Sequence, residues 1–360
     1  MNTFKRVFAV ILVLATMFTF VGCHKKNEVA VTVDGVEFTS AYYMCALVFA
    51  DSEARSEIDA KNTDTDKEID YYSEKIDGKK YVDFVKDKAL SELKKIAAYK
   101  IKCKEAKLEL EDEEKESSDM YASYYWSSYG YQQLLEPNGV SEATYKQYML
   151  DSGYSNLYFE HLYGEGGEKE IPAKDVEKKL YDNFLVANVL EGSFANLEDA
   201  QKTELENKFN TYLKDLKEGK RTFEEIYKEH YNVTDEEEEH DHEGEEPNTH
   251  PMDEYATILG SKDTETYASD YYDTVSKMSN GEIKLVKLDD DAGLVILIKK
   301  DIKADPYYKK NLDITVRHLI GDEEFEKTID EYVKTLKIEE NKFATKQFKV
   351  KKIAYPETTA

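Results

Sequence analysis

The stretch YVDFVKDKALSELKKIAAYKI, residues 81–101, decides most of the fold. Its apolar residues recur three and four positions apart, which is the spacing of a helix that buries one face. These residues are Tyr81, Phe84, Val85, Ala89, Leu93, Ile96, Ala97 and Ile101. The 360-residue chain holds only 6 prolines and 16 glycines. Because such a composition favours helices, we expect a long amphipathic helix here, within a helical lobe.

Towards the N-terminus, apolar and polar residues alternate over VAVTVDGVEF, residues 29–38. The Asp34-Gly35 pair in its middle predicts a short β-hairpin. Thr39 or Ser40 is a suitable N-cap for the helix expected to follow.

Beyond residue 101, the patterns predict further helices and a few strands. Helices are expected at 112–135, 141–150, 154–163, 171–184, 197–217, 223–229, 267–278 and 307–343, with Ser141 as a cap. Strands are expected at 185–190, 283–288 and 293–298, the last two as a hairpin. The predicted fold class is therefore α+β.

The first residues are typical of an exported protein. Two positive charges precede an apolar run, residues 7–21, that is too short to cross a bilayer comfortably. The following FVGC, residues 20–23, resembles the processing box of bacterial lipoproteins. We expect residues 1–22 to be a signal peptide and a lipid on Cys23 to anchor the protein at the extracytoplasmic face of the cell membrane. The alternative is an ordinary secretory signal with an incidental cysteine.

The chain is strongly acidic. It has 75 Asp and Glu against 49 Lys and Arg, a formal net charge of −26. Removal of residues 1–22 makes the charge −28, because they hold one Lys, one Arg and no acid. Such a charge disfavours nucleic acid and anionic lipid surfaces, so we expect no nucleic-acid partner and membrane attachment through the anchor alone.

Two further cysteines, Cys45 and Cys103, lie within helical patterns. They could pair in an oxidising compartment. We favour small buried apolar residues as their role.

Several phrases occur along the chain in a known order. EAKLELEDEE (105–114) ends the long helix, and VANVL (186–190), TFEEI (222–226) and MSNGEI (278–283) follow it. This order resembles the PrsA-type lipoprotein foldases of Gram-positive bacteria and their periplasmic relatives of the SurA type, over nearly the whole mature chain. The resemblance implies a helical chaperone lobe with an inserted peptidyl-prolyl isomerase domain of the parvulin class. It also implies unfolded or nascent secreted proteins as partners, and no cofactor.

The same resemblance predicts the domain boundaries. Residues 23–180 would form the N-terminal part of the chaperone lobe, and residues 305–360 would complete it. Residues 181–304 would form the parvulin-like domain, interrupted by an acidic, histidine-containing insertion at 235–251.

Parvulins resemble one another in placing two histidines, on the first and last strands, across a prolyl pocket. By alignment of the phrases, Asn188 and Val295 occupy these positions, Asp235 that of a nearby Asp or Cys, and Tyr267 and Tyr271 those of pocket residues. Rotation about an X-Pro bond has a barrier of about 18–20 kcal/mol, and Val295 can donate no hydrogen bond to lower it. We therefore expect a membrane-anchored chaperone with a degenerate isomerase site. An active peptidyl-prolyl isomerase using Asn188 and Asp235 is the alternative.

The insertion at 235–251 suggests a second alternative. It holds many carboxylates and three histidines, His240, His242 and His250, and both groups bind zinc. A stretch of such low complexity is more typical of a solvated loop. A metal-binding solute receptor is thus the more distant hypothesis.

The sequence YASYYWSSYGY, residues 121–131, is rich in tyrosine. Four of its tyrosines share one helical face: Tyr121, Tyr124, Tyr125 and Tyr129. They could bind unfolded peptides, because tyrosine makes adaptable contacts at low entropic cost. A stripe at helical spacing is first a signal of core packing, which is the interpretation we favour from the sequence.

Overall fold

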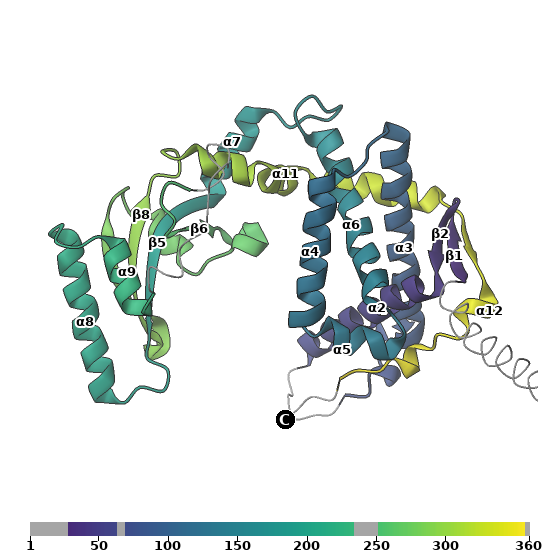
Figure 1. The fold of residues 1–360 in the computed structure, drawn as a ribbon, viewed down its shortest axis with the longest axis horizontal. Helices are drawn as coiled ribbons and strands as arrows, with labels where there is room; N and C mark the ends of the chain where they lie inside the picture. The colour runs from purple at the N-terminus through teal and green to yellow at the C-terminus, as the bar shows by residue number, and fades with distance from the viewer. Residues whose placement is uncertain (1–27, 63–68, 234–250, 357–360) are drawn as a thin grey trace, which may run out of the picture. The chain divides into compact units, whose positions relative to one another are not determined.

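The computed structural model describes residues 28–62, 69–233 and 251–356, which fold into two units (Figure 1). One unit combines the described residues up to Leu162 with those from Glu323 onward, and the other is Tyr163–Asp322. Helices and antiparallel sheets occur in separate segments, so the predicted α+β class is confirmed. The second unit is longer at both ends than the 181–304 segment expected from the sequence. In the described ranges, no helix combines the length and apolar composition needed to cross a membrane.

The first unit contains a three-stranded antiparallel sheet in the order β2-β1-β9. β1 (Val29–Val33) and β2 (Val36–Thr39) form the predicted hairpin. Its turn residues have left-handed backbone angles, with φ of 40° and 87°, which Asp and Gly tolerate. The helix predicted over 307–343 is too long. α11 (Pro306–Thr335) ends earlier, and the residues of β9 (Ile338–Glu340) pair with the free edge of β1.

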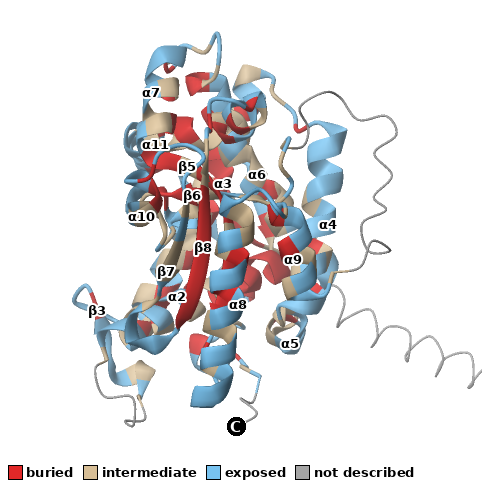
Figure 2. Ribbon diagram, turned by 90° about the vertical axis from the view of Figure 1, so that its left-hand side faces the viewer, coloured by how far each residue is buried: buried red, intermediate tan, exposed pale blue. Residues whose placement is uncertain are grey.

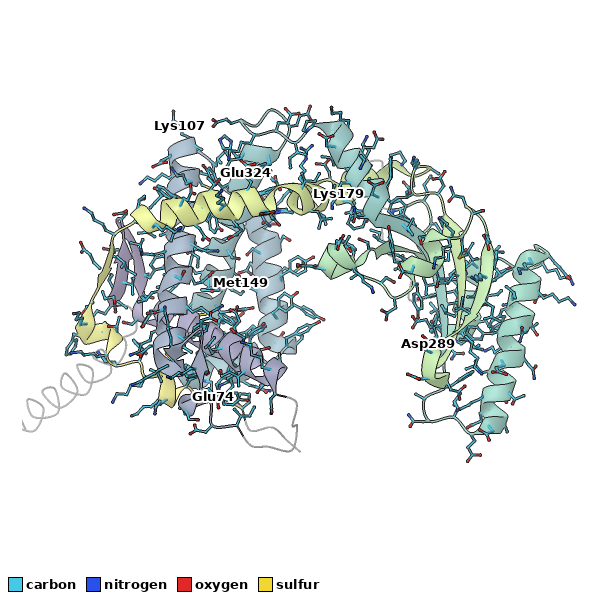
Figure 3. The ribbon with its side chains drawn as sticks, turned by 180° about the vertical axis from the view of Figure 1, so that it is seen from behind. Glu74, Lys107, Met149, Lys179, Asp289 and Glu324 are labelled. Carbon is cyan, nitrogen blue, oxygen red and sulfur yellow. The ribbon has the colours of Figure 1, made fainter. Side chains whose placement is uncertain are left out.

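Four long helices and the end of α11 form the body of this unit. They are α2 (Ser40–Lys61), α3 (Tyr81–Ala106), α4 (Asp112–Ser128) and α6 (Glu142–Tyr163), with α6 between α3 and α4 (Figure 1). α11 crosses these helices at Glu324 (Figure 3). There the ring of Phe325 lies 6.0 Å from Tyr99 of α3 and 5.2 Å from Phe159 of α6. The unit's shorter elements are η1 (Tyr71–Ser73), β3 (Lys75–Ile76), β4 (Lys79–Lys80), α5 (Tyr131–Leu135), η2 (Glu136–Asn138), α12 (Lys342–Thr345) and η6 (Val350–Lys352).

Local signals set the helix starts better than the helix ends. The hydroxyls of Thr39 and Ser141 accept hydrogen bonds from the backbone N–H groups three residues on, so both predicted caps are confirmed. The helix predicted at 112–135 is divided, because Gly130 adopts a left-handed φ of 76° between α4 and α5. The break predicted before residue 154 is wrong, since α6 continues through Gly153. Cys45 and Cys103 are buried free thiols, as expected.

A buried carboxylate joins three distant segments of this unit. Asp51 of α2 is fully buried and accepts hydrogen bonds from the hydroxyls of Tyr81, at 2.8 Å, and Tyr355, at 2.7 Å. The Nε of Arg55 donates to it at 2.9 Å, and the guanidinium lies 4.3 Å from the ring centre of Tyr355. The carboxylate therefore ties α2 and α3 to the C-terminal segment.

The second unit is built on a four-stranded antiparallel sheet in the order β6-β5-β8-β7. Its strands are β5 (Phe184–Ser193), β6 (Ala256–Gly260), β7 (Ile283–Lys287) and β8 (Gly293–Lys300). β8 is apolar at successive positions because it is a central strand covered on both faces, and it is red in Figure 2. The sequence predicted β5, β7 and β8 but missed the edge strand β6.

Each face of this sheet has its own covering. α8 (Asp199–Lys217) and α9 (Phe223–Tyr231) pack on the face that carries Leu190, Ile296 and Ile298. α10 (Tyr272–Ser276) packs on the face that carries Ala187 and Val295. Only residues 272–276 of the helix predicted at 267–278 are α-helical, and the 3₁₀ segment η4 (Lys262–Tyr267) precedes them. α7 (Ala173–Asn183) leads into the sheet, and η5 (Asp289–Asp291) joins β7 to β8.

Candidate functional site

A pocket of about 650 Å³ opens in the second unit beside the start of β6. β6 pairs with β5 only between Phe184 and Asn188, so the following residues of β5, Val189 and Glu191, border the pocket. The rest of the lining comes from α9, from residues 254–259 and from residues 266–271, which include the end of η4. The pocket thus lies at the edge of the sheet, between α9 and the segments 254–259 and 266–271.

Tyrosine is the main side chain of this pocket. Five line it: Tyr227, Tyr231, Tyr255, Tyr267 and Tyr271. The ring of Tyr227 lies 4.7 Å from that of Tyr231 and 5.0 Å from that of Tyr255. The structure therefore brings the predicted pocket residues Tyr267 and Tyr271 together, with three tyrosines that the sequence analysis did not select.

Glu191 is held in a defined position at the rim. The hydroxyl of Tyr271 donates to its Oε1 at 2.5 Å. Its backbone N–H donates to the Tyr231 hydroxyl at 3.2 Å, and its carbonyl oxygen lies 2.9 Å from Nε2 of His230. Burial and the bond to Glu191 raise the pKa of Tyr271, so its phenol stays protonated and keeps donating.

Asn188 does not lie in this pocket. Its side chain is fully buried, and Nδ2 donates to both carboxylate oxygens of Asp253 at 3.2 Å. Asp253 also pairs with Lys300 at 2.5 Å. Burial alone would raise the pKa of Asp253, but the bonds from Lys300 and Asn188 outweigh it and lower that pKa. Asn188 thus fixes the segment that leads into β6.

The register of the sheet explains this placement. Asn188 lies opposite Ile298, on the face covered by α8 and α9, whereas Val295 lies opposite Glu191 on the other face. Asn188 and Val295 therefore do not face each other. Val295 is buried in the cluster against which Tyr271 packs. On β5, the residue directly across from Val295 is Glu191, which the sequence analysis missed and which alternation along β5 could have found.

Gly260 of β6 sets the distance between the sheet and the segment that carries Tyr267. A Cβ at this position would lie 1.9 Å from the hydroxyl oxygen of Thr264 and 2.7 Å from the carbonyl oxygen of Tyr267. We expect Gly260→Ala to displace η4, to destabilise the protein by about 1–3 kcal/mol, and to weaken binding of a fluorescent proline-containing peptide by about tenfold. Denaturant unfolding and fluorescence anisotropy measure the two effects.

Gly281→Ala is the control for this substitution. Gly281 has a left-handed φ of 80° and no atom within 4 Å of the added Cβ, so alanine there adds about 1–2 kcal/mol of backbone strain away from the pocket. Its peptide affinity should remain that of the parent protein. Equal losses of affinity in both variants would mean that Gly260 does not shape the pocket.

The predicted peptide-binding tyrosines lie in the first unit, on α4 and its C-cap. Tyr121, Tyr124 and Tyr129 are 53%, 53% and 63% exposed, and Tyr125 is half-buried. The opposite face of α4 is buried through Ala122 and Trp126. The core-packing interpretation is therefore wrong for the three exposed rings, since the core takes the other face. α4 is largely pale blue in Figure 2.

At the end of α4, the rings of Tyr124, Tyr125 and Tyr129 contact one another. Tyr129 lies 5.6 Å from Tyr124 and 5.1 Å from Tyr125, measured between ring centres. Met120, 59% exposed, precedes them on the same helix. We call Met120, Tyr121, Tyr124, Tyr125 and Tyr129 the tyrosine surface.

Several predicted site residues lie outside the described residues. They are Cys23, Asp235, His240, His242 and His250. Within the described ranges, no group of three or more His, Cys, Asp or Glu side chains is placed to hold a metal ion. The catalytic roles of Asn188 and Asp235 stay predictions.

Comparison with solved structures returns foldases. The chain is similar to PrsA from Lactococcus lactis, with 12% identity and a TM-score of 0.39 over 88% of this chain and 97% of that one. The chain resembles PrsA foldases in structure. PrsA from Streptococcus pneumoniae (13% identity, TM-score 0.40, 68% and 82% covered) and from Bacillus subtilis (14%, 0.31, 68% and 81%) are similar to it as well. No family model and no curated protein sequence matches the chain.

Proposed function

We propose that this protein is an extracytoplasmic chaperone that binds unfolded secreted proteins and is held at the membrane by a lipid on Cys23. The observation that carries the proposal is the tyrosine surface. Folded proteins seldom expose grouped aromatic side chains unless they contact a partner. Tyrosine suits a partner without a fixed sequence, because its ring covers apolar groups and its hydroxyl bonds to peptide backbone.

The rest of the chain supports this role. The net charge of −26 keeps a protein with exposed aromatic rings soluble. It also gives the body no attraction to an anionic membrane, so the lipid would supply the attachment. No cofactor is needed, because binding and release involve no covalent step.

The pocket of the second unit supports an alternative activity. Its tyrosine lining suits a proline ring. A peptidyl-prolyl isomerase must stabilise a twisted amide. The position across from Val295 is a carboxylate held by Tyr271, so we favour a module that binds proline segments over one that isomerises them.

Two assays run in parallel test the proposal. The full chain is expected to suppress aggregation of a proline-free unfolded client at equimolar concentration, and to leave the isomerisation rate of a proline peptide unchanged. Acceleration of isomerisation that is lost in Tyr267→Ala would establish the isomerase instead. Inactivity in both assays would refute the chaperone and the isomerase together.

A further inference from the structure

The charges of the pocket in the second unit all have one sign. Its lining includes two carboxylates, Glu191 and Glu254, and no Lys, Arg or His among the described residues. Both glutamates are exposed, so a ligand can reach them from solvent. His230 lies behind Glu191, and burial lowers the pKa of its imidazole, which is therefore neutral near pH 7 and supplies no opposing charge. The pocket thus favours cations over anions and neutral groups.

The tyrosine rings strengthen this preference. The face of an aromatic ring attracts a cation, and the effect grows where water is partly excluded. Four of the five lining tyrosines, Tyr227, Tyr255, Tyr267 and Tyr271, are half-buried. A methylene chain ending in a positive charge would pack against these rings and reach the carboxylates at the rim.

Glu191 is prepared for such a ligand. Tyr271 occupies its Oε1, and in the described part of the chain no residue bonds its Oε2. Tyr231 and His230 hold its backbone and Tyr271 holds its carboxylate, so the carboxylate loses little freedom when a ligand binds.

We infer that this pocket takes a lysine or arginine side chain of an unfolded client, next to the segment that the tyrosines bind. The inference rests on the proposed function, because it names the class of segment that the pocket selects. Secreted chains that carry a basic residue beside a proline are the substrates this geometry fits.

Three fluorescein-labelled peptides of equal length test the inference. They differ only in the residue before a central proline, which is lysine, norleucine or glutamate. By fluorescence anisotropy with the full chain at low salt, we expect the lysine peptide to bind about fivefold to tenfold more tightly than the norleucine peptide, and the glutamate peptide most weakly. The preference should shrink in about 1 M salt, where the screening length falls to about 3 Å.

Matched variants locate the preference. In the Glu191→Gln, Glu254→Gln double variant, the lysine preference should fall below about twofold, because glutamine at 191 still accepts from Tyr271 but carries no charge. Glu204→Gln is the control, since Glu204 is exposed on α8 and away from the pocket lining. It should keep the full preference.

The other outcomes separate the two proposals. A preference that persists in the double variant would come from the overall charge and would overturn the inference. Equal binding of all three peptides, lost in Tyr267→Ala, would also overturn it and leave the proposed pocket intact. Absence of binding by every peptide would overturn both the inference and a client-binding role for this pocket.

Discussion

Replacing Asp51 with alanine is expected to lower the free energy of unfolding of the first unit by about 3–5 kcal/mol, the usual cost of removing one partner from a buried ion pair. The substitution leaves the hydroxyls of Tyr81 and Tyr355 and the guanidinium of Arg55 without their common acceptor. It also opens a void between α2 and α3. Denaturant unfolding followed by tryptophan fluorescence measures this loss, because the single tryptophan of the chain, Trp126, is buried in this unit.

Asp59→Ala provides the comparison for Asp51. Asp59 lies on the same helix and accepts a hydrogen bond from the Tyr71 hydroxyl at 2.8 Å, but it is exposed. Its loss should cost less than about 1 kcal/mol. Asp51→Asn should fall between the two, since the amide oxygen still accepts from one tyrosine while the charge opposite Arg55 is lost. Equal midpoints for the Asp51→Ala and Asp59→Ala variants would show that the buried network does not hold the unit together.

The triple variant Tyr121→Ser, Tyr124→Ser, Tyr129→Ser is expected to bind an unfolded client roughly a hundredfold more weakly. Three exposed tyrosines that each contribute about 1 kcal/mol to binding account for this loss. Aggregation suppression should fall with the affinity. Stability should change little, because these rings are exposed and serine has a helix propensity similar to that of tyrosine.

Two controls separate the surface from general effects. The matching triple change to phenylalanine keeps the rings and should retain most of the binding. Phe343→Ser removes an aromatic side chain that is 71% exposed on α12, outside the tyrosine surface, and should leave client binding unchanged. A triple serine variant with full affinity would remove the main support for the chaperone proposal.

Elements with strong local signals were predictable from the sequence. The β1–β2 hairpin, α3, the β7–β8 hairpin and the caps at Thr39 and Ser141 depend on residues near one another in the chain. β9 was not predictable, because its short polar sequence is a strand only through pairing with β1. The effect of a glycine on a helix was likewise not predictable from the sequence. Gly130 ends a helix and Gly153 does not, a difference that depends on backbone conformation and packing.

The sequence predicted two of the residues that line the pocket and missed the others. Tyr267 and Tyr271 were found because they lie at the end of η4 and in the loop after it, whose place in the order of elements is clear. Asn188 lies in the core and not in the pocket, and a sequence pattern does not show this, because successive residues of a strand point to opposite faces. Pairing across the sheet, which brings Val295 opposite Glu191, is not visible in either strand alone.

The pairing of β1 with β9 also sets an order of assembly. Val31 lies near the start of the chain and its partner Glu340 near the end, so during synthesis the first strand emerges long before the last. Residues Tyr163–Asp322 are contiguous and can complete their own sheet in the meantime. Until residues 338–340 are synthesised, the edge of β1 that pairs with β9 stays open, and such an edge can pair with strands of other chains. The first unit of this proposed chaperone therefore cannot complete its own sheet until synthesis of the chain is nearly finished.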